Sequence, residues 1–397
     1  MIERKQYLDK LISFKDKKLI KVVTGIRRCG KSTLFRLYQQ YLQKNGIDAS
    51  QIQNINLEDL DNLHLRNFEV LYKHIMQNAV KNKKNYIFLD EIQLVPEFEK
   101  TVDSLFIKEN MDVYITGSNA HMLSGELATL LSGRYVEIKM LPLSFKEYCS
   151  AFSENQNIER LFNDYLLNSS FPYTLELTNK DNINDYLSGL YNTVLLKDII
   201  ARRKFSDVQQ VENIIKFLAD NIGNECSLRK ISNCLTTEGR KTSYHLVDNI
   251  IDALKESFVI YSASKYDIKG KQYLQSGEKY YLVDIGLRYM LLGNKPTDYG
   301  HILENVVYLE LLRRGYKVFV GKNNNSEVDF VATNRDTVEY YQVSHSVADS
   351  HTLERELKSL QSIKDNYPKY LLTRDIMPNV DHNGIKQINV LDWLLKE

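Results

Sequence analysis

The stretch from Gly25 to Ser32 combines residue types that bind phosphate. It reads Gly-Ile-Arg-Arg-Cys-Gly-Lys-Ser, so that four residues separate the two glycines and Lys31 follows the second of them. Glycines let the backbone form a tight loop whose N–H groups point at phosphate oxygens. The lysine would neutralise the β- and γ-phosphates, and the Ser32 hydroxyl would be a ligand for Mg²⁺. The pattern predicts a site for a nucleoside triphosphate.

The elements on either side of this loop support the same interpretation. The apolar run LIKVVTG (19–25) predicts a strand before it, and KSTLFRLYQQYLQ predicts an amphipathic helix that begins near Lys31. The positive end of the helix dipole would then face the phosphates. An ordinary strand–helix turn is the alternative. We expect the nucleotide to contact Gly25, Arg27, Arg28, Cys29, Gly30, Lys31, Ser32 and Thr33.

A second apolar run ends in two acids. The stretch YIFLDE (86–91) predicts a strand with Asp90 and Glu91 at its carboxyl end. Asp90 would order the Mg²⁺ shell, and Glu91 would activate a water molecule for attack on the γ-phosphate. An acidic helix cap after a buried strand is the alternative. The two motifs together predict ATP and Mg²⁺ as cofactors and ATP hydrolysis as the reaction, with Lys31 and Glu91 as catalytic groups.

The first 145 residues have the pattern of a doubly wound α/β domain. Short runs that are apolar throughout are typical of parallel strands covered by helices on both faces. Helical stretches separate these runs, which favours a mostly parallel sheet. Five strands are predicted, over 19–25, 52–57, 86–91, 112–118 and 135–141.

Further motifs accompany the first two. The stretch ITGSNA (115–120) ends the fourth predicted strand, and SGRYVEI (132–138) leads into PLSFKEY (142–148). Together with GIRRCGKS and LDEIQ, they resemble the bacterial and archaeal AAA-type ATPases that carry a C-terminal domain of unknown function. The resemblance covers nearly the whole chain. It implies a P-loop AAA-like core with ATP as ligand, a helical and winged-helix middle, and a C-terminal module like the restriction endonucleases.

The resemblance gives two further positions a role. AAA proteins place a polar sensor of the γ-phosphate after the fourth strand, where Ser118 and Asn119 are candidates and Asn119 is preferred. A helix cap is the alternative there. These proteins place an arginine finger before the fifth strand, where Arg134 would reach a neighbouring subunit's nucleotide in a homo-oligomer. A favourable cation at a helix C-terminus is the alternative for Arg134.

Two arginines lie inside the phosphate-binding loop itself. Arg27 and Arg28 could reach phosphate, or they could pair with an acid from the second strand such as Glu58. The sequence does not decide between these alternatives.

Three further domains are predicted after the core at 1–145. They are a helical lid over 146–205, a winged-helix-like domain over 206–297 and a restriction-endonuclease-like domain over 298–397. The winged helix is predicted from a helix–turn–helix pair followed by two β-rich runs. Its basic residues make DNA the leading candidate partner, while acids in its second helix leave protein binding open. These basic residues are Arg240, Lys241, His245, Lys265, Lys269, Lys271 and Lys279.

The last hundred residues resemble the restriction-endonuclease-like fold but depart from its active-site pattern. Glu304 lies on a predicted helix and Asp329 on a predicted hairpin, as that fold requires. The next strand reads QVS (342–344), where the pattern has an acid and a lysine. Metal-assisted hydrolysis needs carboxylates and a positive charge, so we expect a retained fold used for binding rather than an active nuclease. Lys322 is a further candidate for the missing charge.

Composition limits the remaining possibilities. The chain has 397 residues with 52 basic and 51 acidic side chains, so its net charge of +1 provides no strong overall field for nucleic acid or lipid. Its four cysteines form no CxxC pair, which argues against a zinc site or a disulfide framework and fits the cytoplasm. No apolar run approaches the roughly 18 residues that span a bilayer, so no membrane contact is expected.

These observations lead to one main hypothesis. The chain is expected to be a cytoplasmic, Mg²⁺-dependent ATPase that acts as a switch or motor, with DNA as the leading partner. An ATP-gated scaffold with little turnover is one alternative, and an ATP-gated nuclease is the other.

Overall fold

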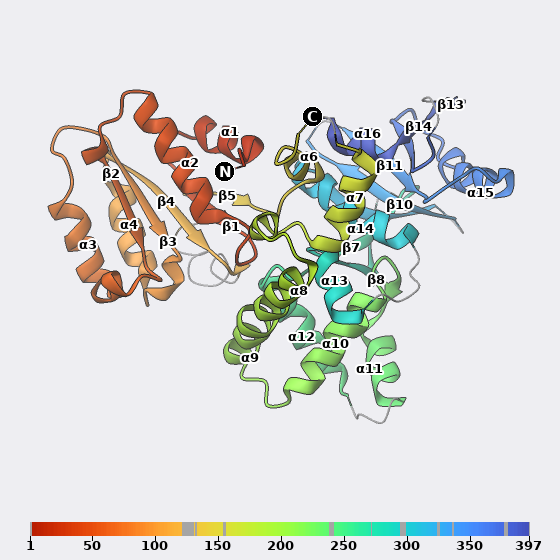
Figure 1. Ribbon diagram of the computed structural model, residues 1–397, viewed down its shortest axis with the longest axis horizontal. Helices are drawn as coiled ribbons and strands as arrows, with labels where there is room; N and C mark the ends of the chain where they lie inside the picture. Colours follow the sequence, from red (N-terminus) through yellow and green to blue (C-terminus); the bar gives the residue numbers. More distant parts are fainter. Residues whose placement is uncertain are drawn as a thin grey trace. The chain divides into compact units, whose positions relative to one another are not determined.

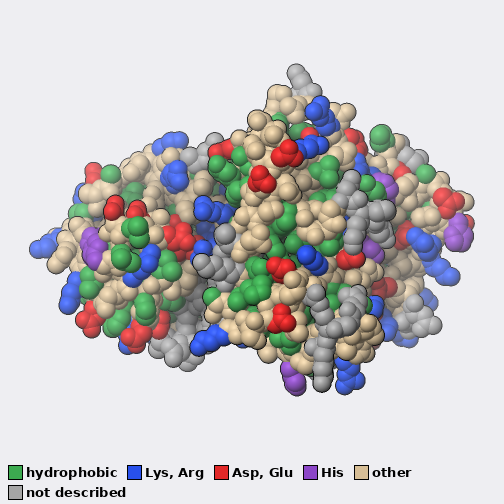
Figure 2. All heavy atoms as spheres, turned by 60° about the horizontal axis from the view of Figure 1, so that its bottom comes forward, with side chains coloured by type: hydrophobic (Ala, Val, Ile, Leu, Met, Phe, Trp, Pro, Cys, Tyr) green, Lys and Arg blue, Asp and Glu red, His purple; other side chains and the backbone are tan. Residues whose placement is uncertain are grey.

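The computed structural model describes most of the chain, in two compact units. The first unit is Met1–Pro142 with Glu256–Phe258, and the second is Leu143–Lys255 with Val259–Glu397. The described residues are 2–120, 131, 133–153, 156–237, 242–270, 272–293, 299–323, 326–335, 337–376 and 380–396. On the face shown in Figure 2, basic and acidic side chains are interspersed.

The first unit alternates strands and helices around one sheet (Figure 1). Its sheet has the order β2-β3-β4-β1-β5, and every neighbouring pair is parallel. This confirms the predicted parallel α/β core. The elements are α1 (Lys5–Ser13), β1 (Ile20–Thr24), α2 (Lys31–Lys44), η1 (Ala49–Gln51), β2 (Ile52–Asn56), η2 (Leu60–Leu65), α3 (Phe68–Gln77), β3 (Asn85–Asp90), η3 (Ile92–Leu94), α4 (Phe98–Ile107), β4 (Met111–Gly117) and β5 (Tyr135–Lys139).

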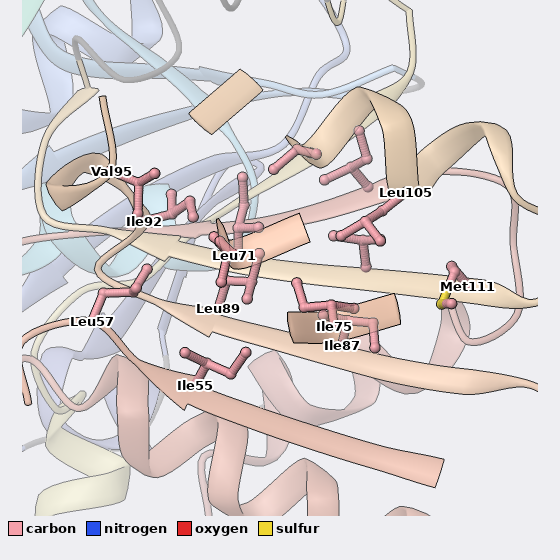
Figure 3. Packing of buried hydrophobic residues seen from close by; sticks show 14 of the residues in the cluster. Ile55, Leu57, Leu71, Ile75, Ile87, Leu89, Ile92, Val95, Leu105 and Met111 are labelled. Atoms are coloured by element: carbon pink, nitrogen blue, oxygen red, sulfur yellow. The ribbon is translucent and has the colours of Figure 1, made fainter. Parts of the chain in front are cut away.

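The apolar character of β3 follows from its position between two layers of helices. All six of its residues are buried, and successive side chains of a strand point to opposite faces. Ile87 and Leu89 join the cluster that contains Leu71 of α3 and Leu105 of α4 (Figure 3). Phe88 packs on the other face, where its ring centroid lies 5.1 Å from that of Phe35 in α2.

The register of the parallel strands brings their carboxyl ends to one edge. Thr24 of β1 is aligned with Gly117 of β4, and Leu89 of β3 with Ile115 of β4. The residues that follow each strand therefore meet at this edge. The loop from β1 to α2 and the acids that end β3 are among them, so the sheet itself positions the two predicted motifs.

The second unit begins with helices. These include a π-helix, η6, between α8 and α9. The helices between residues 143 and 256 are α6 (Phe145–Cys149), α7 (Ile158–Asn168), η5 (Pro172–Glu176), α8 (Lys180–Gly189), η6 (Leu190–Leu196), α9 (Lys197–Arg203), α10 (Val208–Asp220), α11 (Leu228–Thr237) and α12 (Tyr244–Glu256).

A mixed sheet forms the rest of the second unit. Its strands are β6 (Glu225–Cys226), β7 (Ile260–Asp267), β8 (Gln272–Leu282), β9 (Lys317–Asn323), β10 (Ser326–Thr333), β11 (Val338–Val343), β12 (Lys369–Thr373), β13 (Val380–His382) and β14 (Ile385–Asn389). The accompanying helices are α13 (Ile285–Leu292), α14 (Tyr299–Arg313), α15 (Ser350–Gln361) and α16 (Val390–Leu395).

One pairing joins the two C-terminal regions that the sequence separates at 297/298. The hairpin β7–β8 is antiparallel, and β7 also pairs in parallel with β9, so that strands from both regions belong to one sheet. The four-domain division and the winged-helix interpretation stay predictions. Among the described helices, none has the length and apolar character needed to cross a lipid bilayer.

Candidate active site

The loop between β1 and α2 depends on glycine at its first position. Gly25 has φ +150°, and a Cβ atom built there would lie 2.1 Å from the carbonyl oxygen of Met140. The backbone of the loop therefore passes against the chain that leaves β5. Gly30 has φ +102° and is the N-terminal cap of α2, so the turn into the helix also uses a left-handed residue. The predicted strand–loop–helix context is confirmed.

Lys31 lies folded over this loop. Its side chain is buried, and its ammonium donates hydrogen bonds to the carbonyl oxygens of Gly25 at 3.0 Å and Ile26 at 3.3 Å. Nζ also lies 3.5 Å from Oε1 of Glu91. The ammonium is thus held between the carbonyl groups that open the loop and the Glu91 carboxylate.

Asp90 ends β3 with a buried carboxylate. Its Oδ1 accepts a hydrogen bond from the Thr116 hydroxyl of the adjacent strand β4. Ser32 presents an exposed hydroxyl in the first turn of α2, and Thr33 beside it is half-buried. Carboxylate and hydroxyl oxygens are hard ligands of the kind that Mg²⁺ prefers, so this donor set fits the ion.

Glu91 has an unusual backbone conformation and a buried carboxylate. Its φ is +54°, and its N–H group donates to Oγ1 of Thr116 at 2.8 Å. Burial alone would raise the pKa of the carboxyl, but the Lys31 ammonium, the Gln93 amide and Arg27 outweigh it and leave this pKa below its usual value. Glu91 is therefore ionised at neutral pH, as a general base must be.

Two residues of the site were missed from the sequence. Thr116 connects the two acids, because it donates to Asp90 and accepts from the Glu91 backbone. Gln93 donates from Nε2 to the Glu91 carboxylate and lies 3.3 Å from Oγ of Ser118. The register between β3 and β4 brings Thr116 beside the two acids, and the sequence of either strand alone does not specify this register. Gln93 lies in LDEIQ, yet its spacing alone indicates no role.

The sensor candidates lie at the same edge of the sheet. Ser118 and Asn119 follow β4, and both side chains are buried. The contact of Ser118 with Gln93 places its hydroxyl near Glu91. The helix that Asn119 would cap in the alternative interpretation falls on residues 121–131, nearly all of which lie outside the described residues. The sensor role of Asn119 stays a prediction.

The loop residues between the glycines have different surroundings. Nη1 of Arg27 lies 3.5 Å from Oε1 of Glu58, so Arg27 makes the ion pair that was one of its two alternatives. Arg28 is exposed with φ +66°. Cys29 is fully buried, and burial raises the pKa of its thiol. The Cys29 carbonyl oxygen accepts a hydrogen bond of 3.0 Å from the guanidinium of Arg4.

Arg134 is not brought together with these groups. It precedes β5, and its carbonyl oxygen accepts from the N–H of Ile20 at the amino end of β1. This is the edge of the sheet opposite to the phosphate loop. Its guanidinium pairs with Asp103 of α4 and remains partly exposed. An arginine at this edge does not reach its own chain's loop, so the finger role stays a prediction that requires a second subunit.

The structure brings Glu304, Asp329 and Gln342 together, but with a lysine among them. Nζ of Lys279, from β8, lies 3.6 Å from Oε2 of Glu304 and 2.8 Å from Oε1 of Glu327. Oε1 of Gln342 accepts from the N–H of Asp329 at 3.3 Å. In the parts of the chain that the structure describes, no group of three or more His, Cys, Asp or Glu side chains is arranged to hold a metal ion.

This buried cluster perturbs its ionisable groups. Burial and the nearby Glu304 carboxylate raise the pKa of Asp329 well above its usual range, although Lys279 opposes the shift. Burial acts to lower the pKa of Lys279, but Glu304, Asp329 and Glu327 raise it further than burial lowers it. Lys279 therefore stays charged and takes the central position among the carboxylates. Lys322, the alternative candidate, is exposed on β9.

Two of the lysines predicted for the basic wing pair with acids, while Lys269 is exposed. Lys265 is buried beside Oε2 of Glu225 at 2.6 Å, and Lys279 belongs to the acidic cluster, so neither faces a DNA backbone. His245 lies in the first turn of α12 with its ring near that of Tyr244. Arg240, Lys241 and Lys271 lie outside the described residues.

Family models match two parts of the chain. Residues 17–149 match the model described as an AAA domain, and residues 159–298 match a domain of unknown function. The first match contains every residue of the candidate site at the carboxyl edge of the first sheet.

Whole-chain relatives come from bacteria and archaea. An uncharacterized protein of Haemophilus influenzae is 41% identical over 400 residues, which cover 100% of this chain and 99% of that protein. An uncharacterized protein of Methanocaldococcus jannaschii is 31% identical over 368 residues, which cover 87% of this chain and 79% of that protein.

Among solved structures, a Walker-type ATPase of Pyrococcus abyssi is similar in fold. It has a TM-score of 0.51 and 15% sequence identity, and the match covers 73% of this chain and 96% of that one. At this level of identity the likeness concerns the fold alone.

Proposed function

The chain belongs to the AAA-type P-loop ATPases that carry a C-terminal domain of unknown function, and from this we propose that it binds and hydrolyses ATP with Mg²⁺ as a switch or motor. The proposal rests on one observation above all. Nζ of Lys31, at the start of α2, lies 3.5 Å from Oε1 of Glu91, which follows β3, and both side chains are buried at the carboxyl edge of a parallel sheet.

Binding is assigned to the loop and to the start of α2. The N–H groups from Gly25 to Ser32 surround the phosphates, and Lys31 exchanges its carbonyl acceptors for β- and γ-phosphate oxygens. Ser32 and Asp90 would hold Mg²⁺, which when bound neutralises charge on the β- and γ-phosphates. Thr116 keeps Asp90 in place through its hydroxyl.

Hydrolysis is assigned to Glu91. Its buried and ionised carboxylate would take a proton from the attacking water, with Asn119 as the polar sensor of the γ-phosphate. Arg134 would complete the site of a neighbouring subunit. Mass measurement with and without a non-hydrolysable ATP analogue tests this part, because a strict monomer in both states would contradict a finger in trans.

Single-turnover hydrolysis of labelled ATP tests the proposal. We expect Glu91→Gln to lower the rate constant by about 10² to 10⁴, the range of general acid–base catalysis. Glu69→Gln is the matched control, because Glu69 is an exposed glutamate in the first turn of α3. Equal and slow hydrolysis by the wild-type protein and Glu91→Gln would favour the alternative of an ATP-gated scaffold.

DNA is proposed as the partner on narrower grounds. The order α11, α12 and the hairpin β7–β8 supports the predicted winged helix, in which the second helix would contact DNA. Fluorescence anisotropy of a labelled DNA duplex, measured over a salt series, tests DNA binding, because contacts with phosphates make the affinity fall as the salt concentration rises. His245→Ala should lower the affinity for the duplex.

Nuclease activity is not proposed. The Lys279 ammonium already pairs with the carboxylates that a metal ion would need as ligands. Gln342 contributes a neutral amide to the same cluster. We expect no nicking of plasmid DNA with Mg²⁺ or Mn²⁺ and ATP. Nicking that is lost in Asp329→Asn would restore the nuclease alternative.

A further inference from the structure

Gln93 holds the carboxylate of Glu91 from the side opposite to the loop lysine. It lies in the short helix η3 (Ile92–Leu94), directly after the left-handed turn at Glu91. Its Nε2 donates to Oε2 of Glu91, while Oε1 of the same carboxylate faces Lys31. The amide nitrogen must face Glu91, because an ionised carboxylate only accepts hydrogen bonds. Each oxygen of Glu91 is thereby assigned to a different neighbour.

The same amide group bridges to the end of the next strand. Nε2 of Gln93 lies 3.3 Å from Oγ of Ser118, which follows β4. One side chain therefore connects the residue that would activate water with the strand end where the γ-phosphate sensor is expected. This arrangement limits the rotation of Glu91.

The amide oxygen of Gln93 is left without a partner. Oε1 is shielded from solvent, and no hydrogen-bond donor reaches it among the described residues. Buried polar atoms are nearly always paired with protein or with an ordered water, so an unpaired acceptor beside a catalytic carboxylate points to a donor that arrives with the substrate. Water is the donor that ATP hydrolysis requires at this place.

We propose that Gln93 is a positioning residue for hydrolysis, which fixes Glu91 through its amide N–H group and accepts a hydrogen bond from the attacking water through its amide oxygen. The inference rests on the proposed ATPase function and concerns the same site. A glutamine can do both because its planar amide carries a donor and an acceptor on one rigid group. Orienting the nucleophile is a recognised contribution to phosphoryl transfer.

The reaction that this arrangement supports is a simple displacement. The water oxygen forms a bond to the γ-phosphorus while the bond from that phosphorus to the β–γ bridging oxygen breaks. The bridging oxygen keeps the electron pair and leaves as part of ADP. One water proton passes to the Glu91 carboxylate, which later releases it to solvent, and inorganic phosphate is formed. Gln93 neither gains nor loses a proton.

Two substitutions at Gln93 separate its two contacts. Gln93→Met keeps the length of the side chain but removes both polar atoms. Gln93→Glu keeps an acceptor oxygen but removes the donor and adds a negative charge beside Glu91. Gln39→Met is the matched control, because Gln39 is a glutamine of α2 whose amide donates to Asn54 in an exposed position.

Single-turnover hydrolysis and labelled-ATP binding are measured on the same preparations of the full chain. We expect both Gln93 variants to lose roughly 10²-fold in the hydrolysis rate constant, as for other lost positioning groups. The dissociation constant for ATP and the melting temperature of Gln93→Met should match the wild type, and Gln39→Met should match it in all three quantities. Gln93→Glu should bind ATP more weakly as well, because it adds a negative charge beside the phosphates. A purely structural glutamine would lower rate, affinity and melting temperature together.

Three results would overturn the inference. Hydrolysis by Gln93→Met at the wild-type rate would show that neither contact contributes to the reaction. Parallel loss of rate, affinity and melting temperature in Gln93→Met would make Gln93 a structural residue. If the wild-type protein hydrolyses ATP no faster than Lys31→Ala, the proposed ATPase function fails first and the role of Gln93 fails with it. The wild-type measurement thus distinguishes the two failures.

Discussion

Nζ of Lys31 lies 3.5 Å from Oε1 of Glu91, so the cation assigned to phosphate binding is neutralised by the carboxylate assigned to catalysis. Both side chains are buried, where an ion pair is screened less than at the surface. A triphosphate bound as proposed would compete with Glu91 for this ammonium. Binding and activation of the carboxylate would then be coupled through one contact.

This coupling predicts the effect of Glu91→Gln on affinity. The substitution removes a negative charge beside the phosphates and frees Lys31, so ATP should bind about threefold to tenfold more tightly, or up to about 1.4 kcal/mol. Titration of a labelled ATP analogue measures the change, with Glu69→Gln as the control. Weaker binding by Glu91→Gln would show that the carboxylate does not compete for Lys31.

The close approach of Gly25 to Met140 predicts a large effect of one added methyl group. Gly25→Ala would place its Cβ 2.1 Å from a backbone carbonyl oxygen, at a positive φ. We expect loss of ATP binding and a lower melting temperature. Gly46→Ala is the matched control, because Gly46 also has a positive φ but has no atom within 4 Å of a built Cβ. Equal effects of both substitutions would mean that backbone strain, and not this contact, is limiting.

Much of this edge could be predicted from the sequence because its signals are local. Asp90 ends an uninterrupted apolar run, and Lys31 follows a glycine at a fixed spacing. Both facts need only neighbouring residues. The contacts of Thr116 and Gln93 depend instead on strand register and on a left-handed turn at Glu91, which no local pattern in the sequence specifies.

Arg4 predicts a stability effect that depends on contacts distant in sequence. Its buried guanidinium donates to the carbonyl oxygens of Cys29 at 3.0 Å, Leu141 at 2.7 Å and Pro142 at 3.3 Å. It thus ties the phosphate loop to the end of the first unit. Hydrogen bonds to charged groups contribute about 1.5–3 kcal/mol each, so Arg4→Ala should lower the melting temperature by several degrees.

The measurement for Arg4 is differential scanning calorimetry, with ATP affinity as a second readout. The affinity should fall as well, because the carbonyl of Cys29 belongs to the loop. Lys10→Ala serves as control, since Lys10 is exposed on α1. An Arg4→Ala protein with unchanged melting temperature and affinity would show that these bonds add nothing to the folded state.

Asp329 predicts a pH-dependent stability difference. Its pKa in the folded protein is raised above the usual 3.8, by burial and by Glu304. The folded state therefore holds a proton that the unfolded state has released, and stability falls as pH rises through the interval from 3.8 to the raised value. Asp329→Asn removes this ionisation. The melting temperature of Asp329→Asn minus that of the wild type should become more positive as the pH is raised from about 5 to about 8.

The control for Asp329→Asn is Asp185→Asn, because Asp185 is exposed on α8. Its melting temperature should follow that of the wild type across the same range. A difference between Asp329→Asn and wild type that does not change with pH would mean that the carboxyl is not held protonated by its surroundings.

The second unit was harder to predict, and Lys279 shows why. The sequence places it on a hairpin as one of several basic residues, while Glu304 and Asp329 are 25 and 50 residues further along the chain. The parallel pairing of β7 with β9 brings the hairpin into the C-terminal sheet, and this long-range pairing decides that Lys279 meets the acids. Local patterning contains no signal for it.

The most direct test of the account is the affinity of the phosphate loop for ATP. Labelled ATP with Mg²⁺ is titrated against the wild-type chain, Lys31→Ala and Lys44→Ala, a substitution at the far end of the same helix. The account predicts saturable binding by the wild type and by Lys44→Ala, and a loss of at least about tenfold in affinity, or about 1.4 kcal/mol, for Lys31→Ala. An unchanged dissociation constant for Lys31→Ala would contradict it.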